Sequence, residues 1–332
     1  MIEVLKPGPL STLQDLGRVG HQRFGVIASG VMDEWAHRTA NLLVGNADDE
    51  ASLEITLMGP VLRFHADALI ALAGADLSPM LDEQPLPMAT PVLVRAGARL
   101  AFGRRRFGCR VCLAVRGGFP VPPVMGSRST YLRAGFGGFE GRALRAGDRL
   151  PLGPDAGGAA FGGLRRALAA GEAPMALPPD FEAPVHPALA GGALRVIAGQ
   201  QWPRFTAQAR ESLVSASFTV NRNSDRMGYR LEGPALALSS PLEMISEAVT
   251  FGTVQVPPDG QPIVLMADRQ TTGGYPKIAT VASVDLPLMA QKLPGDSVSF
   301  TRIELDAARA LDAAREAQFA QLRIRIASLM EN

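Results

Sequence analysis

Short apolar runs separated by glycine, proline or aspartate fill two long stretches of this chain, and they constrain its fold more than any other feature. Between residues 52 and 152 they include Ala68–Ala73, and between residues 194 and 304 they include Ile278–Ala282. Short strands at this spacing are typical of antiparallel barrels and sandwiches. The sequence therefore predicts a mainly β protein built from two related β-barrel subdomains in tandem.

Composition and periodicity predict how the chain is divided. Its 332 residues, 47% of them hydrophobic, exceed what one ordinary core holds. We predict a first barrel subdomain over residues 1–153 and a second over 194–305, joined by a Gly/Ala/Pro-rich linker of residues 154–193. Apolar residues at three- and four-residue steps then predict a C-terminal helix over residues 306–332, docked on a barrel or on another subunit.

Aspartates precede two of the predicted helices. Asp33 stands before the apolar face of Glu34–Val44 and is expected to cap that helix. Asp306 is expected to cap the C-terminal helix in the same way. A third, short helix is predicted around Leu164–Ala170 inside the linker.

Charge and hydropathy exclude several partner classes. The net charge of +1 gives no electrostatic footprint for nucleic acid or an anionic membrane. The N-terminus lacks a signal-peptide pattern, and the longest apolar run, Ala68–Ala75, is too short to span a bilayer. The two cysteines fit a reducing compartment. We therefore expect a soluble, cytoplasmic protein that binds neither nucleic acid nor membrane.

Common carrier and metal motifs are missing from the sequence. Cys109 and Cys112 have C-x-x-C spacing, but on a predicted strand they face opposite sides, and no second pair or nearby histidine completes a zinc site. We read them as packing residues and predict no metal. No P-loop, no G-x-S-x-G elbow and no Met-Lys pair for biotin attachment occurs. The standard motifs for ATP or biotin chemistry are therefore not found on this chain.

A polar loop between two predicted strands is the leading candidate site. It carries an acid, two bases, an amide, hydroxyls and a glycine pair: Asp268, Arg269, Gln270, Thr271, Thr272, Gly273, Gly274, Tyr275 and Lys277. A simple hairpin turn needs far less polar chemistry, and loops on a rigid scaffold are common places for sites. Only three lysines occur in the chain, which makes Lys277 less easily explained by chance.

The residue types in this loop suit acyl or carboxyl chemistry. A glycine pair lets backbone N–H groups approach a developing oxyanion. Asp268 can accept a proton or bind a substrate amide, while Arg269 and Lys277 can neutralise a carboxylate. Tyr275 can donate a proton or stack on a ring, and the two threonines can orient substrate. The alternative is an elaborate hairpin with a local Asp-Arg pair and a buried tyrosine.

Six segments in order resemble the biotin-dependent carboxyltransferase family, also called the allophanate hydrolase subunit 2 family, which includes the C subunit of 5-oxoprolinase. The resemblance covers about residues 1–304, with Ser11-Thr12 standing where the family commonly has two threonines. The C-terminal helix lies outside it. The segments are Gly8–Arg18, Ala40–Asn46, Gly126–Thr130, Ser224–Leu231, Gly252–Pro258 and Asp268–Pro276.

The resemblance implies a fold and a set of site residues. The fold is two tandem cyclophilin-like β-barrel subdomains, in agreement with the strand pattern. Asp268, Tyr275 and Lys277 are implied as catalytic residues. The implied substrate-binding residues are Arg226, Gln255, Arg269, Gln270, Thr271, Thr272, Gly273 and Gly274. Without the resemblance, we would interpret Arg226 in its Asp-Arg turn as part of a local salt bridge of small energy.

The resemblance also implies a function that requires partners. The chain would be the C subunit of an ATP-dependent 5-oxoprolinase that opens 5-oxoproline to L-glutamate, with ATP used by the complex. Its partners would be the A and B subunits of 5-oxoprolinase, with B resembling a kinase inhibitor, and the chain would depend on them for turnover. One alternative is a carboxyltransferase component acting on urea or a similar amide, with biotin on a separate carrier. Another is a non-catalytic regulator that binds a kinase-inhibitor homologue.

Overall fold

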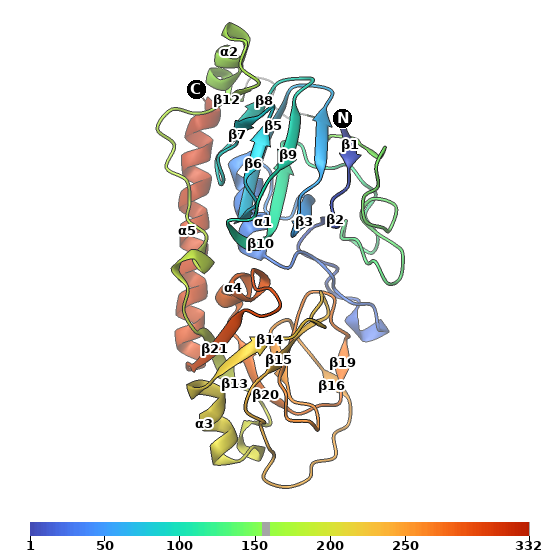
Figure 1. The fold of residues 1–332 in the computed structure, drawn as a ribbon, viewed down its shortest axis with the longest axis vertical. Coiled ribbons are helices and arrows are strands. Elements are labelled where there is room, and N and C mark those ends of the chain that lie inside the picture. The colour runs from blue at the N-terminus through green and yellow to red at the C-terminus, as the bar shows by residue number, and fades with distance from the viewer. Residues whose placement is uncertain (155–159, 332) are drawn as a thin grey trace. The chain divides into compact units, whose positions relative to one another are not determined.

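The computed structural model describes residues 1–154 and 160–331, which form two compact units. The first unit combines Met1–Gly17, Asp33–Leu189 and the chain from Ala317 onward. The second combines Arg18–Met32 with Ala190–Glu316. The chain is mainly β with a long C-terminal helix, which confirms the predicted fold class (Figure 1).

The first unit contains two six-stranded sheets, and the strands within each sheet pair in antiparallel fashion. One has the order β11 (Arg149–Leu150), β1 (Ile2–Lys6), β4 (Val61–Phe64), β9 (Arg99–Phe102), β6 (Pro79–Leu81) and β7 (Gln84–Pro85). The other has the order β12 (Met175–Ala176), β8 (Val92–Val94), β5 (Ala68–Asp76), β10 (Phe107–Val115), β3 (Ser52–Thr56) and β2 (Leu10–Gln14).

Apolar side chains from both sheets share one core. Ile2 and Val4 of β1 point inward with no exposed surface, as do Leu62 and Phe64 of β4, while Arg63 between them is exposed. This two-residue alternation is what a sheet with one buried face requires. The second sheet supplies Leu53, Ile70, Leu113 and others to the same core.

Helix α1 (Glu34–Leu43) covers the outer face of the second sheet. The Asp33 side chain accepts a hydrogen bond from the Ala36 N–H at 2.9 Å, which confirms the predicted cap. A Cβ placed on Gly74 of β5 would lie 3.1 Å from the Ala36 Cβ, so the helix packs directly on that strand. Strand β5 is therefore buried on both faces, which explains its almost continuous apolar sequence.

The predicted linker, residues 154–193, carries ordered elements in its described part. These are α2 (Gly162–Ala170), strand β12 of the second sheet, and a 3₁₀ turn, η2 (Pro187–Ala190). Residues 155–159 of that range lie outside the described residues. The domain boundaries that composition suggests remain a prediction. The contacts within the structure assign the chain from Asp33 to Leu189 to the first unit. Cys109 and Cys112 are buried residues of β10, in agreement with a packing role.

Helix α5 (Leu305–Glu331) has the predicted apolar stripe but not the predicted cap. The Ala308 N–H donates to the Glu304 carbonyl at 3.1 Å, so the helix begins at Leu305 and Asp306 lies within its first turn. In the first unit, its residues from 317 on pack against α1. The Arg38 guanidinium carbon lies 4.0 Å from the ring centre of buried Phe319, and Arg323 pairs with Asp48. The helix thus docks on its own chain.

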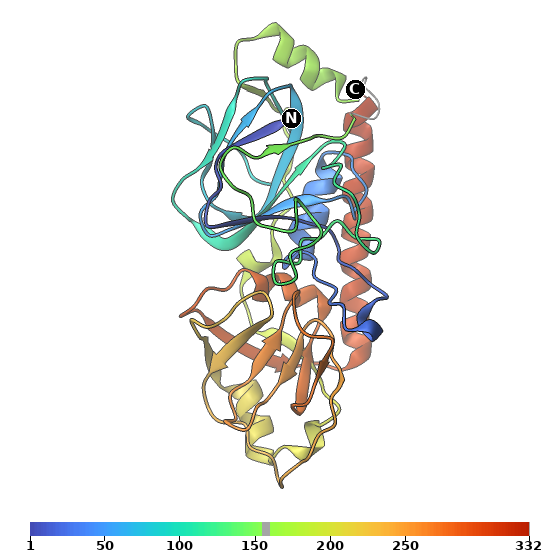
Figure 2. The ribbon, with the colours of Figure 1, turned by 90° about the vertical axis from the view of Figure 1, so that its right-hand side faces the viewer.

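The second unit is a closed seven-stranded barrel (Figures 1 and 2). Its first and last strands pair in parallel and the other pairs are antiparallel. Phe218 and Phe300 meet edge to face inside it, with ring centres 5.9 Å apart. The strand order is β13 (Leu194–Ala198), β20 (Lys277–Val281), β17 (Thr253–Gln255), β18 (Ile263–Leu265), β15 (Gly228–Glu232), β14 (Ser217–Val220) and β21 (Ser297–Arg302).

Short elements surround this barrel. A two-stranded ribbon, β16 (Glu247–Ala248) with β19 (Thr272–Gly273), stands apart from the ring. Besides the first part of α5, the described part of the unit contains these short helices and 3₁₀ turns: α3 (Ala207–Ser215), α4 (Leu286–Ala290), η1 (Gln22–Phe24), η3 (Trp202–Arg204) and η4 (Ser283–Asp285).

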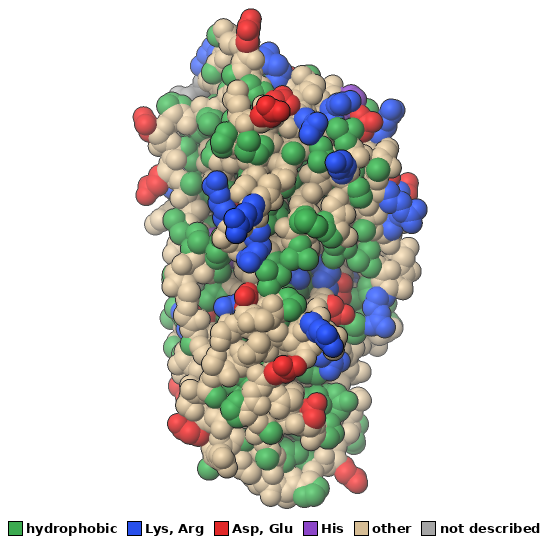
Figure 3. Space-filling model, in the orientation of Figure 1, with side chains coloured by type: hydrophobic (Ala, Val, Ile, Leu, Met, Phe, Trp, Pro, Cys, Tyr) green, Lys and Arg blue, Asp and Glu red, His purple; other side chains and the backbone are tan. Residues whose placement is uncertain are grey.

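The surface carries charged side chains of both signs (Figure 3), as the low net charge leads one to expect. Basic and acidic side chains both occur across the face in Figure 3. Within residues 1–154 and 160–331, no helix is long and apolar enough to cross a bilayer.

Replacing Phe319 by alanine is expected to destabilise the first unit. The ring is 3% exposed, and truncating such a side chain costs about 3 kcal/mol or more. Urea denaturation should show this loss, while Ile324→Ala on the exposed side of the same helix should change stability by less than about 0.5 kcal/mol. Equal effects of both substitutions would contradict the docking of α5.

Stability of the first unit is expected to fall on mild acidification because of His37. The ring has no exposed surface, its Nδ1 lies 2.8 Å from the Ser52 hydroxyl, and burial lowers its pKa to about 4. The unfolded chain binds this proton near pH 6.5 and the folded chain only near pH 4. Stability is therefore complete above pH 6.5 and is lost as pH falls toward 4, by about 2 kcal/mol between pH 7 and 5. The free energy of unfolding of His37→Gln, measured by urea denaturation, should change less between pH 7 and pH 5 than that of the parent. An equal change in both proteins would show that another group causes the pH dependence.

Candidate functional site

Strand register brings Asp268 and Arg226 together in the second unit. Strands β15 and β18 pair with Gly228 opposite Leu265, and the pairing continues past both strand ends. The Met266 N–H donates to the Met227 carbonyl at 2.9 Å, and the Asp268 N–H donates to the Arg226 carbonyl at 2.8 Å. Two of the sequence segments that suggested a family are thereby placed side by side.

The Asp268 carboxylate accepts hydrogen bonds from a charged and a neutral side chain. Arg226 Nε donates to Oδ2 at 2.9 Å and Nη2 to Oδ1 at 3.3 Å, while the Ser29 hydroxyl donates to Oδ1 at 2.7 Å. Asp268 and Arg226 are each 7% exposed. We call Asp268, Arg226 and Ser29 the buried ion-pair cluster. These hydrogen bonds fix the position of the carboxylate.

Ser29 is a member of this cluster that the sequence patterns did not single out. It has a positive φ of 56°, uncommon for a residue other than glycine, and the neighbouring Gly30 carbonyl accepts a hydrogen bond from Arg226 Nη2 at 2.5 Å. No pattern in residues 29–33, Ser-Gly-Val-Met-Asp, indicates that they meet a loop almost 240 residues later.

Arg269 follows the cluster and is much less engaged. Its Nη1 donates to the Met266 carbonyl at 3.3 Å, and its guanidinium carbon lies 5.7 Å from the centre of the Phe251 ring. The Nε atom is buried without a hydrogen-bond partner. Burial lowers the pKa of this guanidinium, and Asp268 opposes that effect only in part. Among the predicted site residues, Arg269 combines burial with the least compensation.

Lys277 is held by a carboxylate of its own. It opens strand β20, and its ammonium donates to Glu247 Oε2 at 2.8 Å and to the Ala248 carbonyl at 3.0 Å. Both partners belong to β16, so the lysine fastens the β16–β19 ribbon to the barrel. A role in proton transfer or substrate binding would require Glu247 to release it.

The Gln255 side chain lies so close to Gly273 that a larger residue at position 273 would collide with it. The glutamine is 1% exposed, and its Nε2 donates to the Tyr275 carbonyl at 3.3 Å. A Cβ on Gly273 would lie 2.5 Å from that nitrogen, so no other residue fits there without displacing the glutamine. Thr272 and Gly273 form β19, and the Thr271 carbonyl accepts from the Val249 N–H. The loop backbone at Gly273 and Tyr275 therefore packs directly on the Gln255 side chain.

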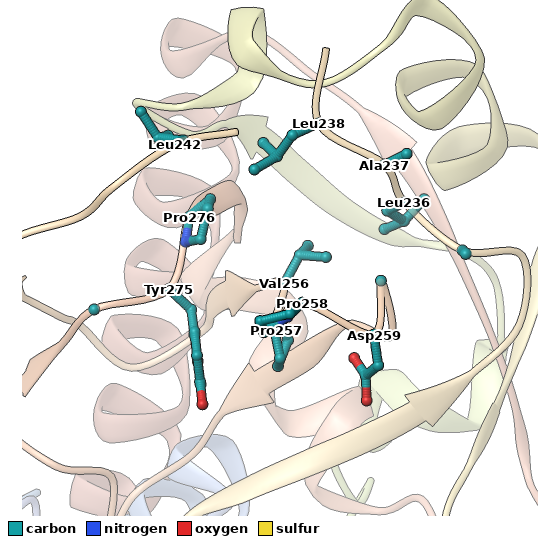
Figure 4. A pocket seen from close by; sticks show the side chains of 13 residues that line it. Leu236, Ala237, Leu238, Leu242, Val256, Pro257, Pro258, Asp259, Tyr275 and Pro276 are labelled. Atoms are coloured by element: carbon teal, nitrogen blue, oxygen red, sulfur yellow. The ribbon is translucent and has the colours of Figure 1, made fainter. Parts of the chain in front are cut away.

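Tyr275 and Gly274 line a separate, mainly apolar pocket of about 520 Å³ (Figure 4). Tyr275 is 44% exposed, so the buried tyrosine of the hairpin alternative is not observed. In Figure 4, Tyr275 and Asp259 flank Pro257 with their polar ends pointing the same way. The other lining residues are Ala235, Leu236, Ala237, Leu238, Leu242, Val256, Pro258, Gly260 and Pro276.

The predicted site residues therefore do not all meet at one place. Asp268 and Arg226 form the buried ion-pair cluster with Arg269 next to it in the chain, whereas Gly274 and Tyr275 belong to the pocket, which neither Asp268 nor Arg226 lines. Gln270 and Thr271 are partly buried and Thr272 is exposed. Within residues 1–154 and 160–331, no three His, Cys, Asp or Glu side chains gather as metal ligands.

A second polar cluster joins two more of the family-like segments, within the first unit. The Asp15 carboxylate accepts hydrogen bonds from the Ser127 hydroxyl at 2.7 Å, the Ser129 hydroxyl at 2.5 Å and the Arg128 N–H at 2.5 Å. Burial raises the pKa of Asp15, but these donors and the Gly17 N–H outweigh it and hold the pKa below its usual value. All four donors are in its own loop or the Gly126–Thr130 loop, so this aspartate acts as a clamp.

Comparisons with known proteins agree on one family. A family model described as "Carboxyltransferase domain, subdomain A and B" matches residues 24–302. The 5-oxoprolinase C subunit of Haemophilus influenzae is 40% identical over 323 residues, covering 97% of this chain and 98% of that protein. Its Escherichia coli counterpart is 37% identical over 326 residues, covering 98% and 99%. The crystal structure of the K. lactis urea amidolyase superposes with a TM-score of 0.83 at 31% identity, over 97% of this chain and 20% of that one.

Replacing Asp268 by asparagine is expected to destabilise the second unit. The substitution keeps the size of the side chain but leaves the Arg226 charge buried without its counter-ion, which costs about 3 kcal/mol. Urea denaturation should show this loss, and the exposed Asp259→Asn should stay within about 0.5 kcal/mol of the parent. A loss below about 1 kcal/mol for Asp268→Asn would show that the pair is not a stabilising contact.

Proposed function

Because the chain belongs to the family of carboxyltransferase domains with subdomains A and B, we propose that it is the C subunit of an ATP-dependent 5-oxoprolinase that opens 5-oxoproline to L-glutamate. The observation that carries the proposal is the match in length. The chain covers 98% and 99% of the two 5-oxoprolinase C subunits, at 40% and 37% identity. The family membership predicted from six motifs is thereby confirmed.

Carboxyl transfer to urea or a similar amide is the second candidate. It is favoured by the TM-score of 0.83 with the K. lactis urea amidolyase, but this chain spans only 20% of that protein. The remaining steps of such a cycle would need a biotin carrier on another chain, since this sequence has no Met-Lys pair. The 5-oxoprolinase proposal needs no carrier and therefore ranks first.

The chemistry of 5-oxoproline suits the residues around Asp268. The substrate offers a lactam N–H, a lactam carbonyl and a carboxylate. Asp268 already accepts three hydrogen bonds, and a carboxylate has room for about one more, which the lactam N–H can supply. Arg226 and Ser29 then act as positioning residues that fix the carboxylate. The backbone N–H groups near Gly273 and Gly274 are candidate donors to the carbonyl.

Tyr275 and Lys277 keep narrower proposed roles. Tyr275 stands at the rim of the apolar pocket, where its ring and hydroxyl contact a ligand or a partner rather than Asp268. Lys277 is tied to Glu247, so we assign it to holding the β16–β19 ribbon in place. Gln255, beneath Gly273, fixes the loop from below.

ATP use is assigned to partner proteins. The sequence contains no Gly-Lys pair and hence no P-loop, so the ATP-consuming step is proposed to need the A and B subunits, with B the kinase-inhibitor-like chain. The proposal places the complex in the cytoplasm, which supplies ATP and keeps Cys109 and Cys112 reduced.

Co-expression with candidate A and B subunits tests this function. The purified complex should release glutamate and ADP from 5-oxoproline and ATP, and a preparation without this chain should not. Equal turnover without the chain would contradict the proposal, and stable complex formation with no effect on turnover would favour a regulatory role. Transfer of labelled carboxyl from a biotin carrier protein to urea would support the second candidate instead.

A further inference from the structure

Three cationic side chains belong to the candidate site, and two of them are already neutralised. Arg226 is paired with Asp268 at 2.9 Å. Lys277 is paired with Glu247 at 2.8 Å. A substrate carboxylate at either one would share the charge with a protein carboxylate that already pairs with it, so it would gain less there than at an unpaired cation.

Arg269 is the cation that lacks such a partner. In the described part of the chain it forms no ion pair within 4 Å, and its one side-chain hydrogen bond, to the Met266 carbonyl, is long at 3.3 Å. Its Nε is buried and unpaired, although a guanidinium has five N–H donors to satisfy. The centre of the Phe251 ring lies 5.7 Å from the guanidinium carbon, a cation–π contact that stabilises the charge less than a carboxylate would.

Local charge has the same implication. Asp268 is paired with Arg226, and within the described residues no carboxylate lies within ion-pair distance of Arg269. The Arg269 side chain is partly buried, and that burial lowers the pKa of its guanidinium. An uncompensated buried charge is costly in a protein interior unless an ion of opposite sign joins it. A ligand carboxylate would accept two parallel hydrogen bonds from this guanidinium.

We propose that Arg269 is the anchor for the carboxylate of the substrate, and this rests on the proposed function for the identity of that substrate. The arginine thereby distinguishes a carboxylate-bearing lactam from a neutral amide. 5-Oxoproline would be held by its carboxylate on Arg269 while its N–H faces Asp268, the next residue along the chain. Pyrrolidin-2-one, the same ring without the carboxylate, lacks this anchor, as does urea.

Steady-state kinetics of the assembled complex test the anchor. Arg269→Gln should raise KM for 5-oxoproline roughly 10- to 100-fold, the range expected for losing hydrogen bonds to a charged group, with kcat changed much less. Arg269→Lys should recover part of the loss. Arg230→Gln, at an exposed arginine on β15 of the same unit, should leave KM unchanged. Unchanged KM in Arg269→Gln, or an equal rise in the Arg230 control, would overturn the proposal.

Direct binding separates this inference from the proposed function. The full chain is titrated with 5-oxoproline and with pyrrolidin-2-one while backbone amide NMR signals of residues 266–275 are followed. The carboxylate ligand should shift these signals more strongly than pyrrolidin-2-one, and the difference should vanish in Arg269→Gln. An inactive complex with this binding pattern would refute the proposed function and retain the anchor. Equal binding of the two ligands, or no binding to chain or complex, would refute the anchor.

Discussion

The ion pair between Asp268 and Arg226 is the contact on which the polar interior of the second unit depends. It lies where the pairing of β15 with β18 runs past the ends of both strands, so the barrel register fixes which residues meet. The Ser29 hydroxyl and the Gly30 carbonyl complete it from residues far earlier in the chain. These two hydrogen bonds, rather than the ion pair itself, join residues 18–32 to the barrel, and the two buried charges of the pair require one another.

Local features of the sequence predicted most of the secondary structure. The Asp33 cap, the apolar stripe of α5 and the strand positions depend on residues within one turn or one strand, and a sequence shows these directly. The predicted start of α5, residue 306, was wrong by one residue. The first turn begins with the hydrogen bond from the Ala308 N–H to the Glu304 carbonyl, and the Asp306 side chain does not cap it. The membership of residues 18–32 in the second unit arises from long-range contacts such as Ser29 with Asp268, and no local pattern encodes them.

The candidate site was predictable as a loop but not as a set of contacts. Composition placed an acid and two bases between strands, yet it did not show which carboxylate each base would meet. Glu247 neutralises Lys277 because β16 pairs with β19, and Arg226 neutralises Asp268 because β15 pairs with β18. Only these pairings show that Arg269 lacks a counter-ion. They also separate Tyr275, on the apolar pocket, from Asp268 in the interior.

The central claim is that the loop from Asp268 to Tyr275 binds the lactam of 5-oxoproline within a complex of several subunits. The most direct measurement is a crystal structure of the assembled complex with 5-oxoproline and a non-hydrolysable ATP analogue. We expect the lactam within hydrogen-bonding distance of the Asp268 carboxylate and the nucleotide on another chain. A lactam held entirely by the other subunits, with this loop unoccupied, would contradict the claim.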